Sequence, residues 1–180
     1  SGAGGVGVWR GACVQVWWVQ GTIVFIRAPK ANPGMVHLWF YTVHWPMQAP
    51  KALLKKYADR TGPGLNDTRY GAMIEAMDLA VGRLLASLEA MGLDDETLVV
   101  FTSDNGGFAG VSDCGPLRES KGHLYEGGIR VPMIVRWPGR VKPGTLSDEP
   151  VVSMDFYPTF LEIAGLKPTT GKPLDGESLV

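Results

Sequence analysis

The sequence lacks a strong charge imbalance, a cysteine framework and a long apolar run. Its 17 Lys and Arg balance 18 Asp and Glu to a net charge of −1, so nothing indicates a nucleic-acid partner or an anionic membrane surface. Cys13 and Cys114 allow at most one disulfide within the chain, which excludes a disulfide scaffold and leaves the redox compartment open. The most apolar stretch, residues 12–26, is interrupted by polar residues and is shorter than the roughly 20 residues of a membrane span. We therefore expect no transmembrane segment.

The composition is that of a globular domain with a real core. The 180 residues are 45% apolar and 19% charged, and no internal repeat or low-complexity linker divides them. Residues 1–34 stand apart, because residues 1–21 are rich in Gly, Val and Trp and follow no clear period. We leave residues 1–34 unplaced and interpret this end as a core segment or as the product of a frameshift or an incomplete gene model. The predicted domain covers residues 35–180.

Strand and helix patterns alternate along the first part of this domain. Residues 35–41, the apolar and aromatic run MVHLWFY, predict a buried strand after a turn signal, and residues 50–57 suit a short helix. A long helix follows, capped by Asn66 or Asp67, and its apolar face repeats at three- and four-residue spacing. That face consists of Met73, Met77, Ala80, Leu84, Leu88 and Met91, before Gly92 at the C-cap position. Residues 97–102 predict the next strand. This order predicts an α/β fold with a mostly parallel sheet flanked by helices.

The remaining elements are shorter. Residues 131–136 predict a strand, and residues 151–154 a second, very short one. Asp155 is placed to cap a helix that ends at Gly165. The Pro- and Gly-rich residues 166–180 are predicted to form a loop.

A carboxylate and an amide follow the strand of residues 97–102. Asp104 and Asn105 lie in the run Ser-Asp-Asn-Gly-Gly, and in open parallel sheets ligands bind beyond the carboxyl ends of strands. The two side chains offer hard oxygen donors, which suit Ca²⁺ or Mg²⁺ better than Zn²⁺. The two glycines allow close backbone approach to a ligand. The alternative is an Asp-Asn-Gly turn with no ligand.

Two further motifs carry candidate site residues. Lys121, among glycines, can place a positive charge against an oxyanion, or can belong to a solvated loop in which Glu126 and Arg130 pair. His44 follows the strand of residues 35–41 in a proline-stiffened loop, where it can face a ligand or be structural.

Taken together, these motifs resemble the sulfatase family of the alkaline-phosphatase-like superfamily. The stretches that carry the resemblance are FYTVHWPMQAP, LLASLEAMGLDDETLVVFTSDNGG, GPLRESKGHLYEGGIRVPMIVRWPG, DFYPTFLEIAGL and LDGESL. They span roughly residues 35–180 and resemble the later part of the sulfatase catalytic domain. The resemblance therefore implies an alkaline-phosphatase-like fold that these residues complete only in part.

The resemblance implies a role for each of the four site residues. Asp104 and Asn105 match paired ligands of a divalent cation, usually Ca²⁺, with Mg²⁺ as the alternative. Lys121 matches a lysine that contacts the sulfate, and His44 a histidine that binds the sulfate or assists the leaving oxygen. The nucleophile in the family is a formylglycine, and the substrate is a small-molecule or carbohydrate sulfate ester. Cations would neutralise the charge that develops on the sulfuryl oxygens.

The sequence also departs from the family pattern. The formylglycine arises within a Cys-x-Pro-x-Arg motif upstream, and neither Cys13 nor Cys114 lies in one. The further upstream metal ligands have no match either. We therefore predict that this chain alone binds metal weakly and does not turn over substrate. A phosphodiesterase or phosphonate hydrolase relative and a non-catalytic remnant are the alternatives. The family is periplasmic, secreted or lysosomal, and the chain shows no intact signal of its own compartment.

Overall fold

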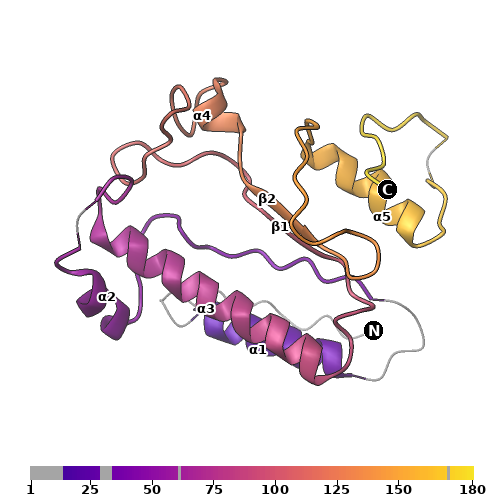
Figure 1. Ribbon diagram of the computed structural model, residues 1–180, viewed down its shortest axis with the longest axis horizontal. Helices are drawn as coiled ribbons and strands as arrows, with labels where there is room; N and C mark the ends of the chain where they lie inside the picture. Colours follow the sequence, from indigo (N-terminus) through magenta and orange to yellow (C-terminus); the bar gives the residue numbers. More distant parts are fainter. Residues whose placement is uncertain (1–13, 29–33, 61, 170) are drawn as a thin grey trace. The chain divides into compact units, whose positions relative to one another are not determined.

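The computed structural model describes residues 14–28, 34–60, 62–169 and 171–180 (Figure 1). These residues fall into two compact units. Residues 14–28 and 35–142 form the first unit, and residues 143–180, with Gly34, form the second.

The longest helix, α3, spans Thr68–Ala90 and organises the first unit. Asp67 is its N-cap, where the side chain accepts a hydrogen bond of 2.9 Å from the backbone N–H of Arg69. Gly92 ends the helix in the left-handed conformation, with φ of 66°, and the N–H of Leu93 reaches back to the carbonyl of Leu88. The predicted apolar face is confirmed, because none of its six residues is exposed.

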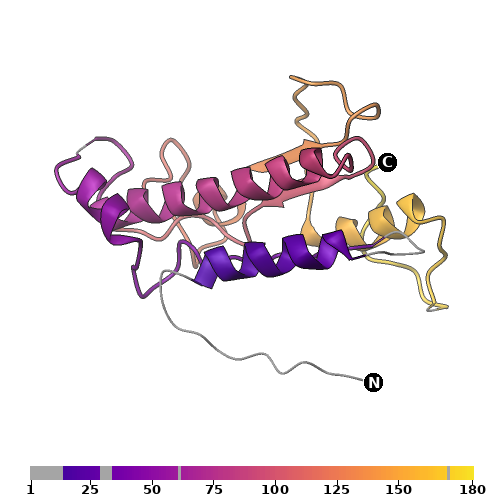
Figure 2. The ribbon, with the colours of Figure 1, turned by 90° about the horizontal axis from the view of Figure 1, so that it is seen from below.

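A helix also covers much of the segment that the sequence left unplaced. This helix, α1, spans Val14–Arg27 and lies alongside α3 (Figure 2). Val19 and Ile23 pack against Ala80 of α3 in a buried apolar cluster. Among the described residues, no helix is long and apolar enough to cross a membrane.

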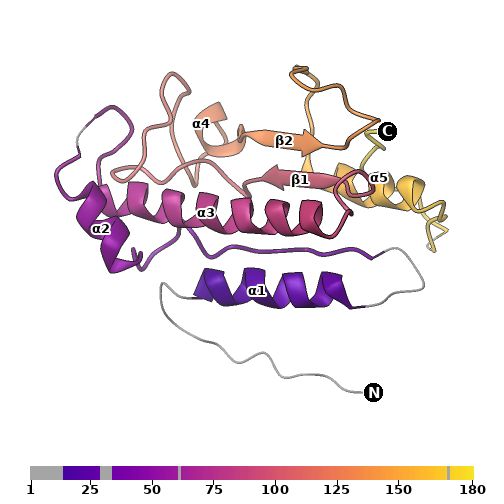
Figure 3. The ribbon, with the colours of Figure 1, turned by 60° about the horizontal axis from the view of Figure 1, so that its bottom comes forward.

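The prediction of a buried strand at residues 35–41 is wrong. These residues run extended between α1 and α3 (Figure 3) and pair with no strand that the structure describes. Leu38 and Phe40 pack on the α1–α3 cluster, whereas Trp39 is 76% exposed. The alternation is that of a strand, but burial on both faces requires neighbouring strands and covering helices, which the described residues do not supply.

A second apolar cluster lies at the N-terminal end of α3. Helix α2, Lys51–Tyr57, packs against α3 there, as the short helix predicted from the sequence. The cluster also draws in residues from two loops. Its buried members are Met47, Ala49, Ala72, Met73 and Val111.

The prediction of a parallel sheet is not supported by the described strands. Strand β1, Val99–Thr102, pairs with β2, Met133–Arg136, in an antiparallel register that joins Val99 to Arg136 and Thr102 to Met133 (Figure 3). Both strands lie within the predicted ranges 97–102 and 131–136, and each begins two residues later than predicted. The connection between them contains one short helix, α4, at Glu126–Ile129, which is too short to act as the crossover that parallel strands need.

The second unit is built on helix α5, Phe156–Ile163, which follows a 3-10 turn at Ser153–Asp155. That turn replaces the short strand predicted at residues 151–154. Asp155 is 8% exposed, and its carboxylate accepts from the N–H groups of Val152 and Glu177, at 2.8 and 3.0 Å. These bonds tie the C-terminal segment to the start of α5, and they hold the pKa of Asp155 below its ordinary value.

Candidate functional site

The candidate site begins where β1 ends. Thr102 donates from its hydroxyl to the carbonyl of Pro132 at 3.2 Å, which fixes the last residue of β1 beside the start of β2. The next hydroxyl, of Ser103, donates to the carbonyl of Asn105 at 2.9 Å and closes a tight turn around Asp104. Asp104 is exposed and Asn105 half-buried, so both side chains remain accessible to a ligand.

The glycines after Asn105 approach other backbone segments. The N–H of Gly106 donates to the carbonyl of Gly128 at 2.9 Å, and the carbonyl of Gly107 accepts from the N–H of Lys121 at 2.8 Å. The sequence predicted close approach to a ligand, whereas the structure shows close approach to the segment that carries the lysine. These contacts bring Asp104, Asn105 and Lys121 to one region of the first unit.

Lys121 is half-buried and makes no ion pair with any residue that the structure describes. The neighbouring cations are engaged. Arg130 pairs with Glu126 at 3.1 Å, as the sequence predicted, and the guanidinium of Arg118 lies 3.8 Å from the ring centroid of Tyr125. The ammonium of Lys121 is therefore a cation of this segment with no ion-pair partner among the described residues.

His44 lies in a loop that reaches the same unit by another route. Its Nδ1 is 3.0 Å from the carbonyl oxygen of Trp45, and its exposed ring lies 5.7 Å, between centroids, from that of Tyr41. The Tyr41 hydroxyl donates to the same carbonyl. Within the described residues, no hydrogen bond or ion pair joins His44 to the other three site residues.

A shared apolar contact nevertheless connects the histidine loop with the segment that follows Gly107. Met47 and Ala49, just after His44, pack in one cluster with Val111. Tyr70 of α3 packs against the same cluster. Burial, with Cys114 nearby, raises the pKa of the Tyr70 hydroxyl.

The donor set of the described residues does not by itself fit a calcium ion. Asp104 and Asn105 supply two oxygen side chains, and the described residues contain no group of three or more His, Cys, Asp or Glu side chains that could hold a metal. Calcium prefers six to eight oxygen ligands. Any bound cation would need ligands beyond those that the structure gathers here.

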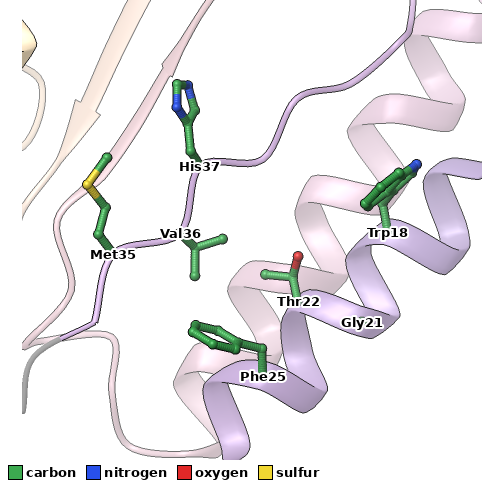
Figure 4. Close-up of a pocket in the computed structure, with 7 residues that line it drawn as sticks. All are labelled: Trp18, Gly21, Thr22, Phe25, Met35, Val36 and His37. Atoms are coloured by element: carbon green, nitrogen blue, oxygen red, sulfur yellow. The ribbon is translucent and has the colours of Figure 1, made fainter. Parts of the chain in front are cut away.

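A hollow of the first unit lies away from these residues. It is lined by Trp18, Gly21, Thr22, Phe25, Met35, Val36 and His37, and Val36 points toward Phe25 and Thr22 of α1 (Figure 4). Among the described residues, no lysine or arginine lines this hollow. We assign the candidate site to the loops after β1 instead.

The chain belongs to the sulfatase family of sulfuric ester hydrolases. The model of that family, described as Sulfatase, matches residues 18–166, a range that includes all four candidate site residues and most of α1.

Relatives and a solved structure agree with this assignment. A sulfatase of Formosa agariphila is 37% identical over 166 residues, which cover 85% of this chain and 30% of the relative. Mouse steryl-sulfatase is 38% identical over 168 residues, which cover 87% and 25%. The crystal structure of Ps i-CgsB in complex with k-i-k-neocarrahexaose superposes with a TM-score of 0.85 and 32% identity, over 92% of this chain and 37% of that one. The chain thus spans 25–30% of the length of the two curated relatives.

Proposed function

We propose that this chain is part of a catalytic domain that hydrolyses sulfate esters. The observation that carries the proposal is a set of backbone hydrogen bonds in a member of the sulfatase family. These bonds join the turn that contains Asp104 and Asn105 to the segment that carries Lys121. A sulfate monoester is anionic, so its hydrolysis requires a site that places positive charge against the sulfuryl oxygens.

Each site residue has a proposed role. Lys121, with no ion pair among the described residues, contacts the sulfate and neutralises charge on its oxygens as the S–O bond breaks. His44 binds the sulfate or protonates the leaving oxygen. Asp104 and Asn105 contribute two oxygen ligands to a divalent cation, Ca²⁺ or Mg²⁺, which when bound would supply further positive charge.

The substrate is proposed to be a carbohydrate or small-molecule sulfate ester. Support comes from Ps i-CgsB, solved with a neocarrahexaose, and from the steryl-sulfatases among the relatives. The formylglycine nucleophile is proposed to lie in sequence outside these 180 residues, and a periplasmic, secreted or lysosomal compartment goes with the same proposal.

The first test is to sequence the encoding DNA upstream of Ser1 in all three frames and to express the full reading frame together with a formylglycine-generating enzyme. We expect a Cys-x-Pro-x-Arg or Ser-x-Pro-x-Arg motif upstream and turnover of 4-methylumbelliferyl sulfate. Turnover of the matching phosphate ester but not the sulfate would refute the proposal.

The second test removes the positive charge of Lys121. Lys121→Ala should lower kcat/KM by about 100-fold or more, because one preorganised charge is lost from the reacting oxygens. Lys167→Ala, at an exposed position of the second unit, is the matched control and should leave kcat/KM unchanged. Equal effects of the two substitutions on kcat/KM would show that Lys121 is not part of the site.

A further inference from the structure

Gly106, in the turn after Asn105, packs with its backbone against the backbone of Gly127 and Gly128 in α4. A methyl group on Gly106 would overlap the carbonyl oxygen of Gly127 and would lie 2.8 Å from its carbonyl carbon and 3.0 Å from the Cα of Gly128. All three atoms belong to the main chain. No side-chain movement could therefore make room for a Cβ at Gly106.

The same two α4 glycines pack on the segment that carries Lys121. A methyl group on Gly127 would overlap the carbonyl oxygen of Glu119, and one on Gly128 would overlap that of His123. Gly127 and Gly128 are both buried. The turn after Asn105 thus contacts α4, and α4 contacts residues 119–123, through main-chain atoms at both steps.

Conformational freedom does not explain glycine at these positions. The glycines with φ in the left-handed region include Gly110 and Gly122, but neither Gly106 nor Gly127. An alanine could adopt the backbone conformation of either residue, and only the close approach of another backbone excludes it.

We propose that Gly106 and Gly127 are positioning residues, which set the distance between the Asp104–Asn105 pair and Lys121. The inference rests on the proposed function for its catalytic meaning and on the packing alone for its geometry. Main-chain contacts fix that distance more rigidly than flexible side chains would. A displacement of about 1 Å in such a site can cost on the order of 100-fold in rate.

The test uses the protein expressed from the full reading frame, with Gly106→Ala and the control Gly82→Ala. Gly82 lies on α3, where an added methyl group would meet nothing within 4 Å. Hydrogen exchange is followed at the Lys121 N–H, which bonds to Gly107, and at the amides of β1. We expect Gly106→Ala to speed exchange at Lys121 at least tenfold more than in β1, and Gly82→Ala to speed exchange at neither place. Equal acceleration at both places would overturn the proposal, because it would show only a global loss of stability.

A second variant pair applies if Gly106→Ala does not fold. A methyl group on Gly107 would meet the side chains of Ser112 and Cys114, with the Cβ of Ser112 at 3.0 Å and Sγ of Cys114 at 3.2 Å. Gly107→Ala should therefore speed exchange at Lys121, and adding Ser112→Gly should restore most of the protection. Failure of the second substitution to restore any protection would also overturn the proposal.

Turnover gives an independent reading. In an active enzyme, Gly106→Ala should lower kcat by about 100-fold, with a smaller change in KM, while Gly82→Ala leaves both unchanged. An unaltered kcat in Gly106→Ala would refute the positioning role. An inactive parent enzyme would refute the proposed function instead, and the exchange measurements would still decide the geometry.

Discussion

Two glycines of α3 should respond in opposite directions to the same substitution. A methyl group on Gly71 would lie 2.7 and 2.8 Å from two ring carbons of Tyr57 and 2.9 Å from a methyl carbon of Leu65, whereas one on Gly82 would meet nothing within 4 Å. Alanine in a helix gains about 1 kcal/mol over glycine, and overpacking costs about 1–3 kcal/mol. Gly82→Ala should therefore stabilise the protein by about 0.5–1 kcal/mol, and Gly71→Ala should destabilise it by up to about 2 kcal/mol.

Urea unfolding followed by circular dichroism measures both changes in the free energy of unfolding. A Tyr57→Leu background supplies the control, because it replaces the ring that faces Gly71 with a smaller side chain. In that background Gly71→Ala should destabilise the protein much less than it does in the parent. The difference between the two destabilisations is the coupling energy of a double-mutant cycle. Equal shifts from Gly71→Ala and Gly82→Ala, with no coupling to Tyr57, would refute the reasoning and show that α2 does not pack on α3 as described.

Three further predictions concern other parts of the chain. Glu119 has φ of 62°, so Glu119→Gly should stabilise the protein by roughly 0.5–1 kcal/mol in thermal or urea unfolding, and Glu119→Gln, which keeps the backbone strain, should not. The N–H groups of Val152 and Glu177 hold the pKa of the Asp155 carboxyl below its ordinary value of 3.8. The stability that these hydrogen bonds contribute is complete above pH 3.8 and is lost as the pH falls through the lower pKa of the folded state. Asp155→Asn should flatten the acid limb of a stability–pH profile, and an unchanged slope would contradict this. Trp39 is 76% exposed and should promote association of the isolated chain. Trp39→Lys should therefore shift the chain toward monomer in size-exclusion chromatography. A parent chain that is already monomeric would contradict this prediction.

Local patterns in the sequence predicted the elements whose signals are local. The start of α3 at Asn66 or Asp67, its end at Gly92 and its apolar face depend on capping chemistry and a 3.6-residue period. The structure confirms the end and the face and selects Asp67 as the N-cap. The positions of α2 and β2 were predicted for the same reason. Helix α1 was missed, because its apolar residues surround it too evenly to give a clear amphipathic period.

The sheet could not be read from the sequence in the same way. Residues 35–41 carry the composition of a strand, but whether such a segment pairs depends on which backbone lies beside it, and here Leu38 and Phe40 pack on helices instead. The direction of β2 relative to β1 likewise depends on the path of the long connection between them. Neither property is encoded in the residues of the strand itself.

The sequence by itself determined the family, the boundaries of α3 and the four candidate residues His44, Asp104, Asn105 and Lys121, because residue type and spacing carry that information. Only the tertiary structure decided which of them lie together. Asp104 and Asn105 are brought beside Lys121 through the backbone of Gly106 and Gly107, while the loop of His44 shares an apolar cluster with the segment that follows Gly107. The physical reason is that contacts between distant segments depend on where a side chain is absent as much as on where one is present. A glycine that admits another backbone cannot be told from one that makes a turn until the fold places that backbone against it.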